Sequence, residues 1–208
     1  MWIAVALVLS CYLLGSLSGS LLLGRLRGVD IRTLGSGNAG GTNALRTQGF
    51  KFALGTVLVD VGKGAAAAGL ALSFLPPDSN AIYACVLAAV AGHVWPIFHG
   101  FRGGKGAATL IGGLAVIWPM SLLVVLGVWI LSMGWGGYVG LSTMLAGLSL
   151  PIFALIQSAA MPRLVFAILA ASFLIYTHRS NIARLRAGTE SRFERARFIG
   201  RWLPKPRA

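Results

Sequence analysis

Residues 35–46, GSGNAGGTNALR, combine a flexible backbone with short polar side chains and one fixed positive charge. The spaced glycines are Gly35, Gly37 and Gly40. The polar side chains are Ser36, Asn38, Thr42 and Asn43, and the charge is that of Arg46. A glycine-rich turn that leads into a helix can hold a phosphate with its free N–H groups. The stretch therefore predicts an anion-binding loop; the alternative is a plain flexible connector.

The same glycines match the G-x-G-x-x-G dinucleotide fingerprint. That motif has its meaning only between a strand and a helix of a βαβ unit. Here it follows a long apolar run instead, so a Rossmann nucleotide site is excluded.

A second polar stretch covers residues 92–109, GHVWPIFHGFRGGKGAAT. Gly103 and Gly104 expose backbone between the charges of Arg102 and Lys105. The segment lacks the glycine and the hydroxyl residue of a Walker A loop. The segment predicts phosphate binding. A basic loop that binds anionic lipid headgroups is an equally good alternative. His93, near the end of an apolar run, is a candidate for touching substrate.

A third stretch, THRSNIARLRAGTE, covers residues 177–190. His178, Asn181 and Arg184 are three residues apart, close enough to one helical face to line a site together. For His178 alone, an interfacial anchor at a helix end is an equally good interpretation.

Asp60 and Lys63 lie within an apolar run, three residues apart. Charges inside a membrane span are expensive and usually functional, but a pair one turn apart can also neutralise itself. We expect this pair to support the site rather than to perform its chemistry.

Conventional catalytic groups are missing from the sequence. It has no Gly-x-Ser-x-Gly elbow and no His-x4-Asp, and Cys11 and Cys85 fall inside apolar runs, where we expect small buried thiols. Five acidic residues are too few for two-metal phosphoryl chemistry, and the histidines and cysteines are not spaced as a metal cage. We predict no metal and no cofactor. An enzyme of this kind needs a substrate that is already activated.

The elements that carry these stretches are membrane helices. Hydrophobic residues make up 56% of the 208 and charged residues 11%, against roughly 25% in a soluble domain. Residues 2–23 are free of charge and span about 33 Å as a helix, long enough to cross a bilayer. Further apolar stretches cover 52–75, 81–98, 107–133, 141–161 and 164–177. The net charge of +13 is concentrated beside these runs, so it indicates membrane orientation rather than nucleic acid.

Charge placement predicts the topology. Basic residues crowd into 24–51, 99–106 and 178–208, whereas 76–80, PPDSN, carries one acid and no base. The positive-inside rule then places the three basic segments in the cytoplasm. Between Lys105 and His178 the chain must cross an even number of times, so one of three apolar stretches has to break. Pro119 is the expected break, because proline ends or kinks a helix. We expect one all-α membrane domain, 1–208, of about seven spans, with the N-terminus outside and the C-terminus cytoplasmic; five spans with a re-entrant pair is the alternative.

The three polar stretches resemble the signature segments of the PlsY family, bacterial membrane acyltransferases that use acyl phosphate. Ser36 to Arg46 is similar to Ser-Gly-Asn-Pro-Gly-Ala-Thr-Asn-x-Leu-Arg, with Ala39 for Pro and Gly41 for Ala. Gly92 to Thr109 and His178 to Glu190 match the second and third segments, and Asp60-x-x-Lys-Gly64 resembles the family's charged pair. One departure is Gly140, which stands where the family has serine, near Ser142.

The resemblance implies transfer of a fatty acyl group from acyl phosphate to the C1 hydroxyl of glycerol 3-phosphate, at the cytoplasmic face of a bacterial inner membrane. It implies catalytic roles for Ser36, Arg46, His93, Lys105 and Asn181. It implies substrate binding by Gly35, Gly37, Asn38, Gly40, Thr42, Asn43, Gly103, Gly104, His178 and Arg184. The expected partners are both substrates, membrane lipid and the soluble enzyme that makes acyl phosphate.

Two other functions are compatible with basic residues among membrane helices. An anion or organic-phosphate transporter predicts polar groups near the midplane and inverted repeats. Here the polar groups lie mostly at one face, and no repeat is visible. A scaffold for other lipid enzymes explains the basic C-terminal tail but not three anion-type motifs.

Overall fold

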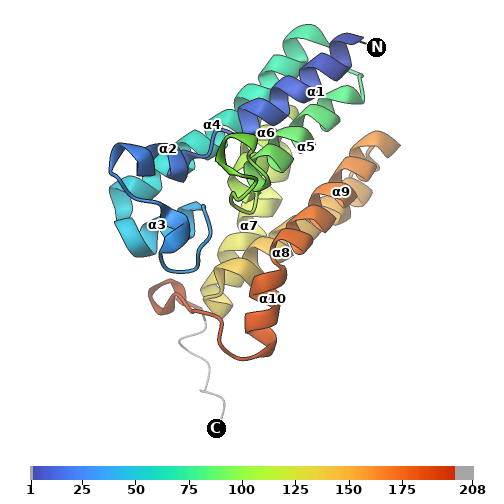
Figure 1. Cartoon of the computed structure of the whole chain (residues 1–208). Helices are drawn as coiled ribbons and strands as arrows, with labels where there is room; N and C mark the ends of the chain where they lie inside the picture. The colour runs from blue at the N-terminus through green and yellow to red at the C-terminus, as the bar shows by residue number, and fades with distance from the viewer. Residues whose placement is uncertain (1, 200–208) are drawn as a thin grey trace. The chain divides into compact units, whose positions relative to one another are not determined.

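The structure is a computed structural model that describes residues 2–199. Within this range the chain is helical and has no strand. The α-helices are α1 (Trp2–Gly15), α2 (Gly19–Leu26), α3 (Gly41–Gln48), α4 (Phe50–Phe74), α5 (Ala81–Val94), α6 (Ala107–Ile117), α7 (Met120–Gly136), α8 (Val139–Ile156), α9 (Met161–Thr177) and α10 (Arg179–Arg186) (Figure 1). Three short 3-10 helices cover Ile31–Thr33, Ile97–His99 and Glu194–Ala196.

The apolar stretch 107–133 is broken where the sequence predicted. Helix α6 ends at Ile117 and α7 begins at Met120, on either side of Trp118 and Pro119. The chain also divides after Pro119 into two compact units. The first contains α1–α6 and the second α7–α10.

Within residues 2–199, the structure has fewer helices that are long enough to cross a membrane than the seven spans that the sequence predicts. Helices α4 and α8 are long and apolar enough to span a bilayer, and so is the stretch Ala81–His99. Two bent pairs pass the same test together, α1 with α2 at 45° and α9 with α10 at 56°. The described residues therefore provide three to five spans by length and composition, with α6 and α7 as shorter apolar helices. Seven spans and the orientation of the termini stay predictions.

The first apolar run, expected as one span over residues 2–23, is in fact interrupted. Helix α1 stops at Gly15 and α2 starts at Gly19. Glycines on both sides of the break pack against neighbouring helices. Gly15 lies so close to Ala89 of α5 that a Cβ would collide with its carbonyl group. Gly19 lies against the backbone of α4 at Thr56, where a Cβ would approach the carbonyl oxygen to 2.6 Å.

Close helix packing in the first unit also depends on glycine. A Cβ at Gly64 of α4 would collide with the carbonyl of Thr109 on α6, and one at Gly112 with the carbonyl of Val61. Such small residues let helix backbones approach in lipid, where packing rather than the hydrophobic effect holds helices together. The thiols of Cys11 and Cys85 are buried in this packing, as expected.

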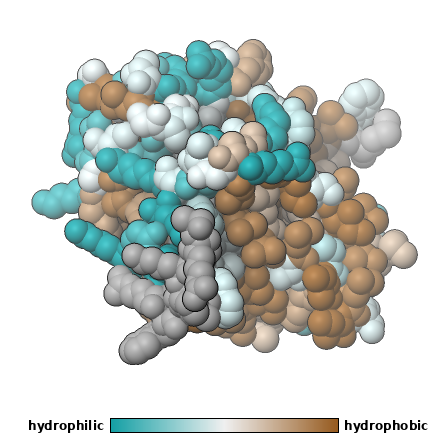
Figure 2. Space-filling view, turned by 90° about the horizontal axis from the view of Figure 1, so that it is seen from below, coloured by the Kyte–Doolittle hydropathy of each residue, from teal (hydrophilic) through white to brown (hydrophobic). Residues whose placement is uncertain are grey.

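Large apolar side chains are exposed on the outer faces of the helices. Leu58 of α4 and Ile152 of α8 are examples, at 64% and 58% exposure. Figure 2 shows broad hydrophobic areas on one face of the molecule, separate from the hydrophilic ones. Exposed apolar surface of this extent is typical of a membrane-embedded protein.

Candidate functional site

The first glycine-rich loop is organised by the buried amide of Asn43. Its Oδ1 accepts a hydrogen bond from the backbone N–H of Ser36 at 3.0 Å. Its Nδ2 donates to the carbonyl oxygens of Ile31 and Leu34, at 3.1 and 2.9 Å. Because the side chain is engaged in this way, the structure gives Asn43 a part in shaping the loop, while its contact with a substrate stays a prediction.

Glycine at two positions of this loop follows from the backbone. Gly35 and Gly37 have φ values of +55° and +71°, in the left-handed region that side chains rarely adopt. A Cβ at Gly35 would in addition collide with the Asn43 amide. Helix α3 begins directly afterwards at Gly41, and no side chain caps its first turn. The loop thus leads to the uncapped N-terminus of a helix, an arrangement that suits an anion.

The second glycine-rich loop folds back onto the end of α5. The N–H groups of Gly103 and Gly104 donate to the carbonyls of Val94 and His93, both at 3.1 Å. Gly106 then turns the chain into α6 with a φ of +86°. Lys105 lies between the hydrogen-bonded backbone of Gly104 and the turn at Gly106, and it is partly buried.

The two glycine-rich loops lie against each other. A Cβ at Gly104 would lie 3.0 Å from the carbonyl oxygen of Ala39 and would collide with the ring of His93. Stretches that are some 60 residues apart in the sequence therefore meet in the first unit. This confirms that two of the three polar stretches converge.

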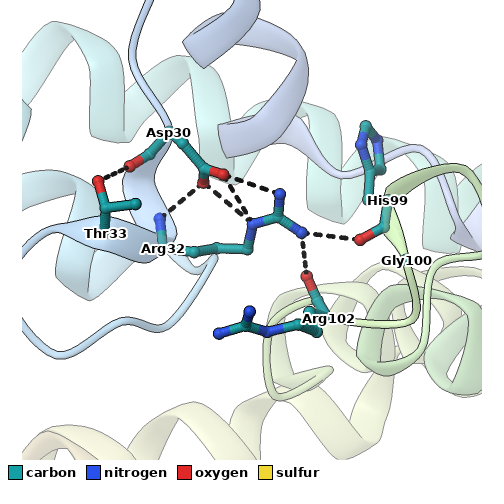
Figure 3. A pocket seen from close by; sticks show the side chains of 6 residues that line it. All are labelled: Asp30, Arg32, Thr33, His99, Gly100 and Arg102. Atoms are coloured by element: carbon teal, nitrogen blue, oxygen red, sulfur yellow. Dashed lines mark hydrogen bonds and ion pairs between the residues drawn. The ribbon is translucent and has the colours of Figure 1, made fainter.

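A basic cluster lies next to these loops (Figure 3). The guanidinium of Arg32 pairs with Asp30 at 2.8 Å and also donates to the carbonyl oxygens of His99 and Arg102, at 2.7 and 3.3 Å. The hydrogen bond from Arg32 lowers the pKa of Asp30 to about 2. Arg32 thereby ties the segment before the first loop to the segment before the second. An open cavity of about 420 Å³ lies here, lined by Asp30, Arg32, Thr33, His99, Gly100 and Arg102.

Sequence reasoning did not single out Asp30 or Arg32. Their spacing of two residues gives no helical face, and the carbonyls that Arg32 contacts lie 67 and 70 residues away. Only the basic flank of the apolar run pointed to this region.

The third polar stretch forms its own cluster in the second unit. Asn181 of α10 donates from Nδ2 to Glu190 at 2.7 Å, and Arg184 donates from Nε to the other carboxylate oxygen at 2.6 Å. Asn181 and Arg184 therefore converge, as their spacing predicted. The carboxylate that joins them was not among the predicted site residues.

His178 lies at the junction of α9 and α10 and is 5% exposed. Its Nδ1 is 2.7 Å from the carbonyl oxygen of Leu174. A carbonyl oxygen only accepts, so Nδ1 carries the hydrogen of the neutral ring, and Nε2 is left with a lone pair. The neutral ring of His178 is thus fixed with its hydrogen on Nδ1.

Gly140 is explained by the same cluster. A Cβ at this position of α8 would lie 2.5 Å from the Asn181 amide nitrogen. Glycine lets α10 approach α8 at the position where the family pattern has serine. Ser142, two residues further, is buried, with its hydroxyl 4.0 Å from the sulfur of Met133.

The predicted site residues are thus distributed over two clusters, one in each unit. The first unit holds Gly35, Ser36, Gly37, Asn38, Gly40, Thr42, Asn43, Arg46, His93, Gly103, Gly104 and Lys105. The second holds His178, Asn181 and Arg184. Among residues 2–199 no group of three His, Cys, Asp or Glu side chains is placed to hold a metal ion. The geometry defines a helical membrane protein with paired glycine-rich, basic loops.

Comparison with known proteins identifies the family. The profile of the family described as glycerol-3-phosphate acyltransferase matches residues 5–188, so a single family covers both units, and the chain belongs to it. Proteins named glycerol-3-phosphate acyltransferase from Chlorobaculum parvum and Chlorobaculum tepidum are 39% and 38% identical to the chain, covering 90% of it and 95% of each relative.

Solved structures agree. The crystal structure of PlsY, an integral membrane glycerol 3-phosphate acyltransferase, in its glycerol 3-phosphate form is similar with a TM-score of 0.87 and 38% identity, covering 91% of this chain and 95% of that one. Its lysophosphatidic acid form has a TM-score of 0.86 and 36% identity, covering 94% and 98%. The resemblance to the PlsY family is confirmed, and with it the all-helical, membrane-embedded fold.

Proposed function

We propose that this chain transfers a fatty acyl group from acyl phosphate to the C1 hydroxyl of sn-glycerol 3-phosphate, giving 1-acyl-glycerol 3-phosphate and inorganic phosphate. The observation that carries the proposal is the contact of the two glycine-rich, basic loops at Ala39 and Gly104. Two anion-binding loops side by side suit a reaction in which both substrates carry phosphate. The solved relatives support the acceptor, since one is described as the glycerol 3-phosphate form and the other as the lysophosphatidic acid form.

Acyl phosphate as donor fits the side chains that are present. It is a mixed anhydride with phosphate as a good leaving group, so no nucleophile on the protein is needed. The C1 hydroxyl oxygen attacks the acyl carbonyl carbon, the bond from that carbon to the phosphate oxygen breaks, and phosphate leaves with the electron pair. The hydroxyl proton passes to a phosphate oxygen or to Nε2 of His178. The protein contributes by orienting the two reactants and by stabilising the negative charge.

The loop Ser36–Asn43 holds the acyl phosphate with its N–H groups and hydroxyls. The two phosphates are divided among Arg46, Lys105, His178, Asn181 and Arg184. The acyl chain lies among the apolar helices, which explains why a phosphate loop follows a membrane span. The charge distribution supports an active site on the cytoplasmic face of a bacterial inner membrane. There the soluble enzyme that makes acyl phosphate can supply it.

The test uses the purified full-length protein in lipid nanodiscs. Palmitoyl phosphate and glycerol 3-phosphate together are expected to release phosphate and yield 1-palmitoyl-glycerol 3-phosphate by mass spectrometry. Palmitoyl-coenzyme A in place of palmitoyl phosphate is the matched control and is expected to give no product. Product from the coenzyme A ester but not from the acyl phosphate overturns the donor assignment. Uptake of glycerol 3-phosphate into proteoliposomes without any acyl product supports a transporter instead.

A further inference from the structure

Three ionisable side chains meet inside the first unit, where the interrupted first span packs against α4 and α5. The ammonium nitrogen of Lys63 lies 3.1 Å from Oδ1 of Asp60 and 2.9 Å from Nδ1 of His93. The same ring nitrogen is 3.3 Å from Asp60 Oδ1. The three residues are 1 to 5% exposed. An ion pair this deeply buried is held by its geometry and its further hydrogen bonds, because taking charges out of water is costly.

The further hydrogen bonds go to the break in the first span. Lys63 donates to the carbonyl oxygen of Leu17 at 2.8 Å, and Asp60 accepts from the backbone N–H of Gly19 at 3.1 Å. The ends of α1 and α2 leave backbone groups without helical partners, and such groups are expensive in a membrane. The pair therefore does more than neutralise itself, because it bonds to the backbone in the gap between the helices and at the start of α2.

The ring of His93 is held against the ion pair through its Nδ1. The ammonium of Lys63 has three N–H donors, and three polar atoms surround it: Leu17 O, Asp60 Oδ1 and His93 Nδ1. Nδ1 of His93 lies within reach of both the Lys63 ammonium and the Asp60 carboxylate, so the ring is held from this side. Nε2 is the atom that a Cβ at Gly104 would strike. The ring thus faces the backbone of the second glycine-rich loop, one residue before Lys105.

His93 holds that loop through its backbone as well. Its carbonyl oxygen accepts the N–H of Gly104 at 3.1 Å, and the Gly104 position in turn lies against Ala39 of the first loop. A continuous set of contacts therefore runs from the break at residues 16–18 through Asp60, Lys63 and His93 to the loop that carries Lys105.

We propose that Asp60, Lys63 and His93 form a positioning unit for Lys105, acting through the backbone of Gly103 and Gly104 rather than by touching substrate. The inference rests on the proposed function, since Lys105 is the group whose placement matters to the reaction. It gives His93 a positioning role in place of the substrate contact expected from the sequence.

The test is a double-mutant cycle on the full-length protein. Asp60→Asn keeps the shape of the side chain and is expected to lower kcat/KM at least tenfold. In a Lys105→Ala background the same change is expected to cost less than a further twofold, because the group it positions is gone. Asp78→Asn, at an exposed acid in the turn between α4 and α5, is the matched control and should change neither background. A tenfold loss from Asp60→Asn in both backgrounds overturns the proposal, since a purely structural defect acts alike in both.

A second variant and a second measurement keep the inference testable. His93→Gln introduces no buried charge, and it is expected to show the same non-additivity with Lys105→Ala if Asp60→Asn fails to fold. Hydrogen exchange of the peptide containing residues 103–106 is expected to quicken in Asp60→Asn and in His93→Gln but not in Asp78→Asn. Unchanged exchange overturns the positioning unit. Because this readout needs no substrate, it remains valid if wild-type protein fails to use palmitoyl phosphate, a result that overturns the proposed function alone.

Discussion

Asn181 donates a hydrogen bond to Glu190 across the turn that follows α10, with 2.7 Å between Nδ2 and Oε1. The other oxygen of the same carboxylate accepts from Arg184 at 2.6 Å. The Glu190 side chain is only 6% exposed. One buried acid therefore orients two of the three residues of the last polar stretch that were expected to line the site.

Glu190→Gln is expected to destabilise the second unit. A glutamine has one carbonyl oxygen in place of two carboxylate oxygens, so either Asn181 or Arg184 faces an N–H donor. Losing a hydrogen bond to a charged group costs about 1–3 kcal/mol, which thermal unfolding in detergent should register as a lower Tm. Glu194→Gln is the matched control, because Glu194 is exposed and its pair with Arg197 is expected to contribute less than about 1 kcal/mol. Equal shifts for the two variants contradict the assigned role of Glu190.

The sequence was informative where the governing physics is local. Pro119 removes a backbone donor, so the break between α6 and α7 follows from one residue. The spacing of Asn181 and Arg184 on one helix likewise predicted that they converge. Glycine-rich segments beside basic residues predicted two loops, and the structure shows both of them, while their binding of anions stays a prediction.

Features that depend on distant partners were missed. The interruption at residues 16–18 sits in a run that is apolar enough for one span, and its stabilising groups come from Asp60 and Lys63 of another helix. Arg32 is similar, because the carbonyls it contacts belong to a loop far along the chain. Contacts between residues so far apart in the sequence cannot be predicted from periodicity or from a local motif.

Lys105→Ala is expected to lower kcat/KM. The decrease should correspond to a loss of about 2–4 kcal/mol of transition-state stabilisation, the usual scale for losing a charge-stabilising donor. The prediction depends on the two glycines that precede Lys105 and fix its backbone against α5. Lys51→Ala, at an exposed lysine in the first turn of α4, is the control for the loss of a basic side chain. Steady-state kinetics with palmitoyl phosphate and glycerol 3-phosphate provide the measurement. If kcat/KM falls less than threefold in folded, membrane-inserted protein, Lys105 binds lipid headgroups instead of a substrate phosphate.

The membrane orientation is testable by cysteine labelling in intact cells. In a background with Cys11→Ala and Cys85→Ala, Asn80→Cys is expected to react with a membrane-impermeant thiol reagent, because the turn between α4 and α5 carries no basic residue. Ser36→Cys and Ser191→Cys lie in basic segments and are expected to react only after the cells are opened. Labelling of Ser191→Cys in intact cells reverses the predicted orientation.

Catalysis is expected to proceed without a covalent acyl-enzyme and without a metal. Both cysteines are buried among apolar helices, and Ser36 follows Gly35 in the first loop, where its N–H is held by Asn43. A serine in a phosphate loop naturally donates a hydrogen bond, so Ser36→Ala should slow turnover through a lost phosphate contact. EDTA should leave the wild-type rate unchanged, because five acids in the whole chain are too few for a two-metal centre.

Incubation with acyl phosphate in the absence of glycerol 3-phosphate distinguishes direct transfer from a two-step route. Direct transfer predicts that mass spectrometry of the intact protein finds no acyl adduct, since the only acceptor is the missing hydroxyl. Ser36→Ala is the matched control, because an adduct on any other residue persists in it. A stoichiometric adduct that forms on the wild type and disappears in Ser36→Ala makes Ser36 a nucleophile. That result overturns direct transfer while leaving the acyl donor and acceptor as proposed.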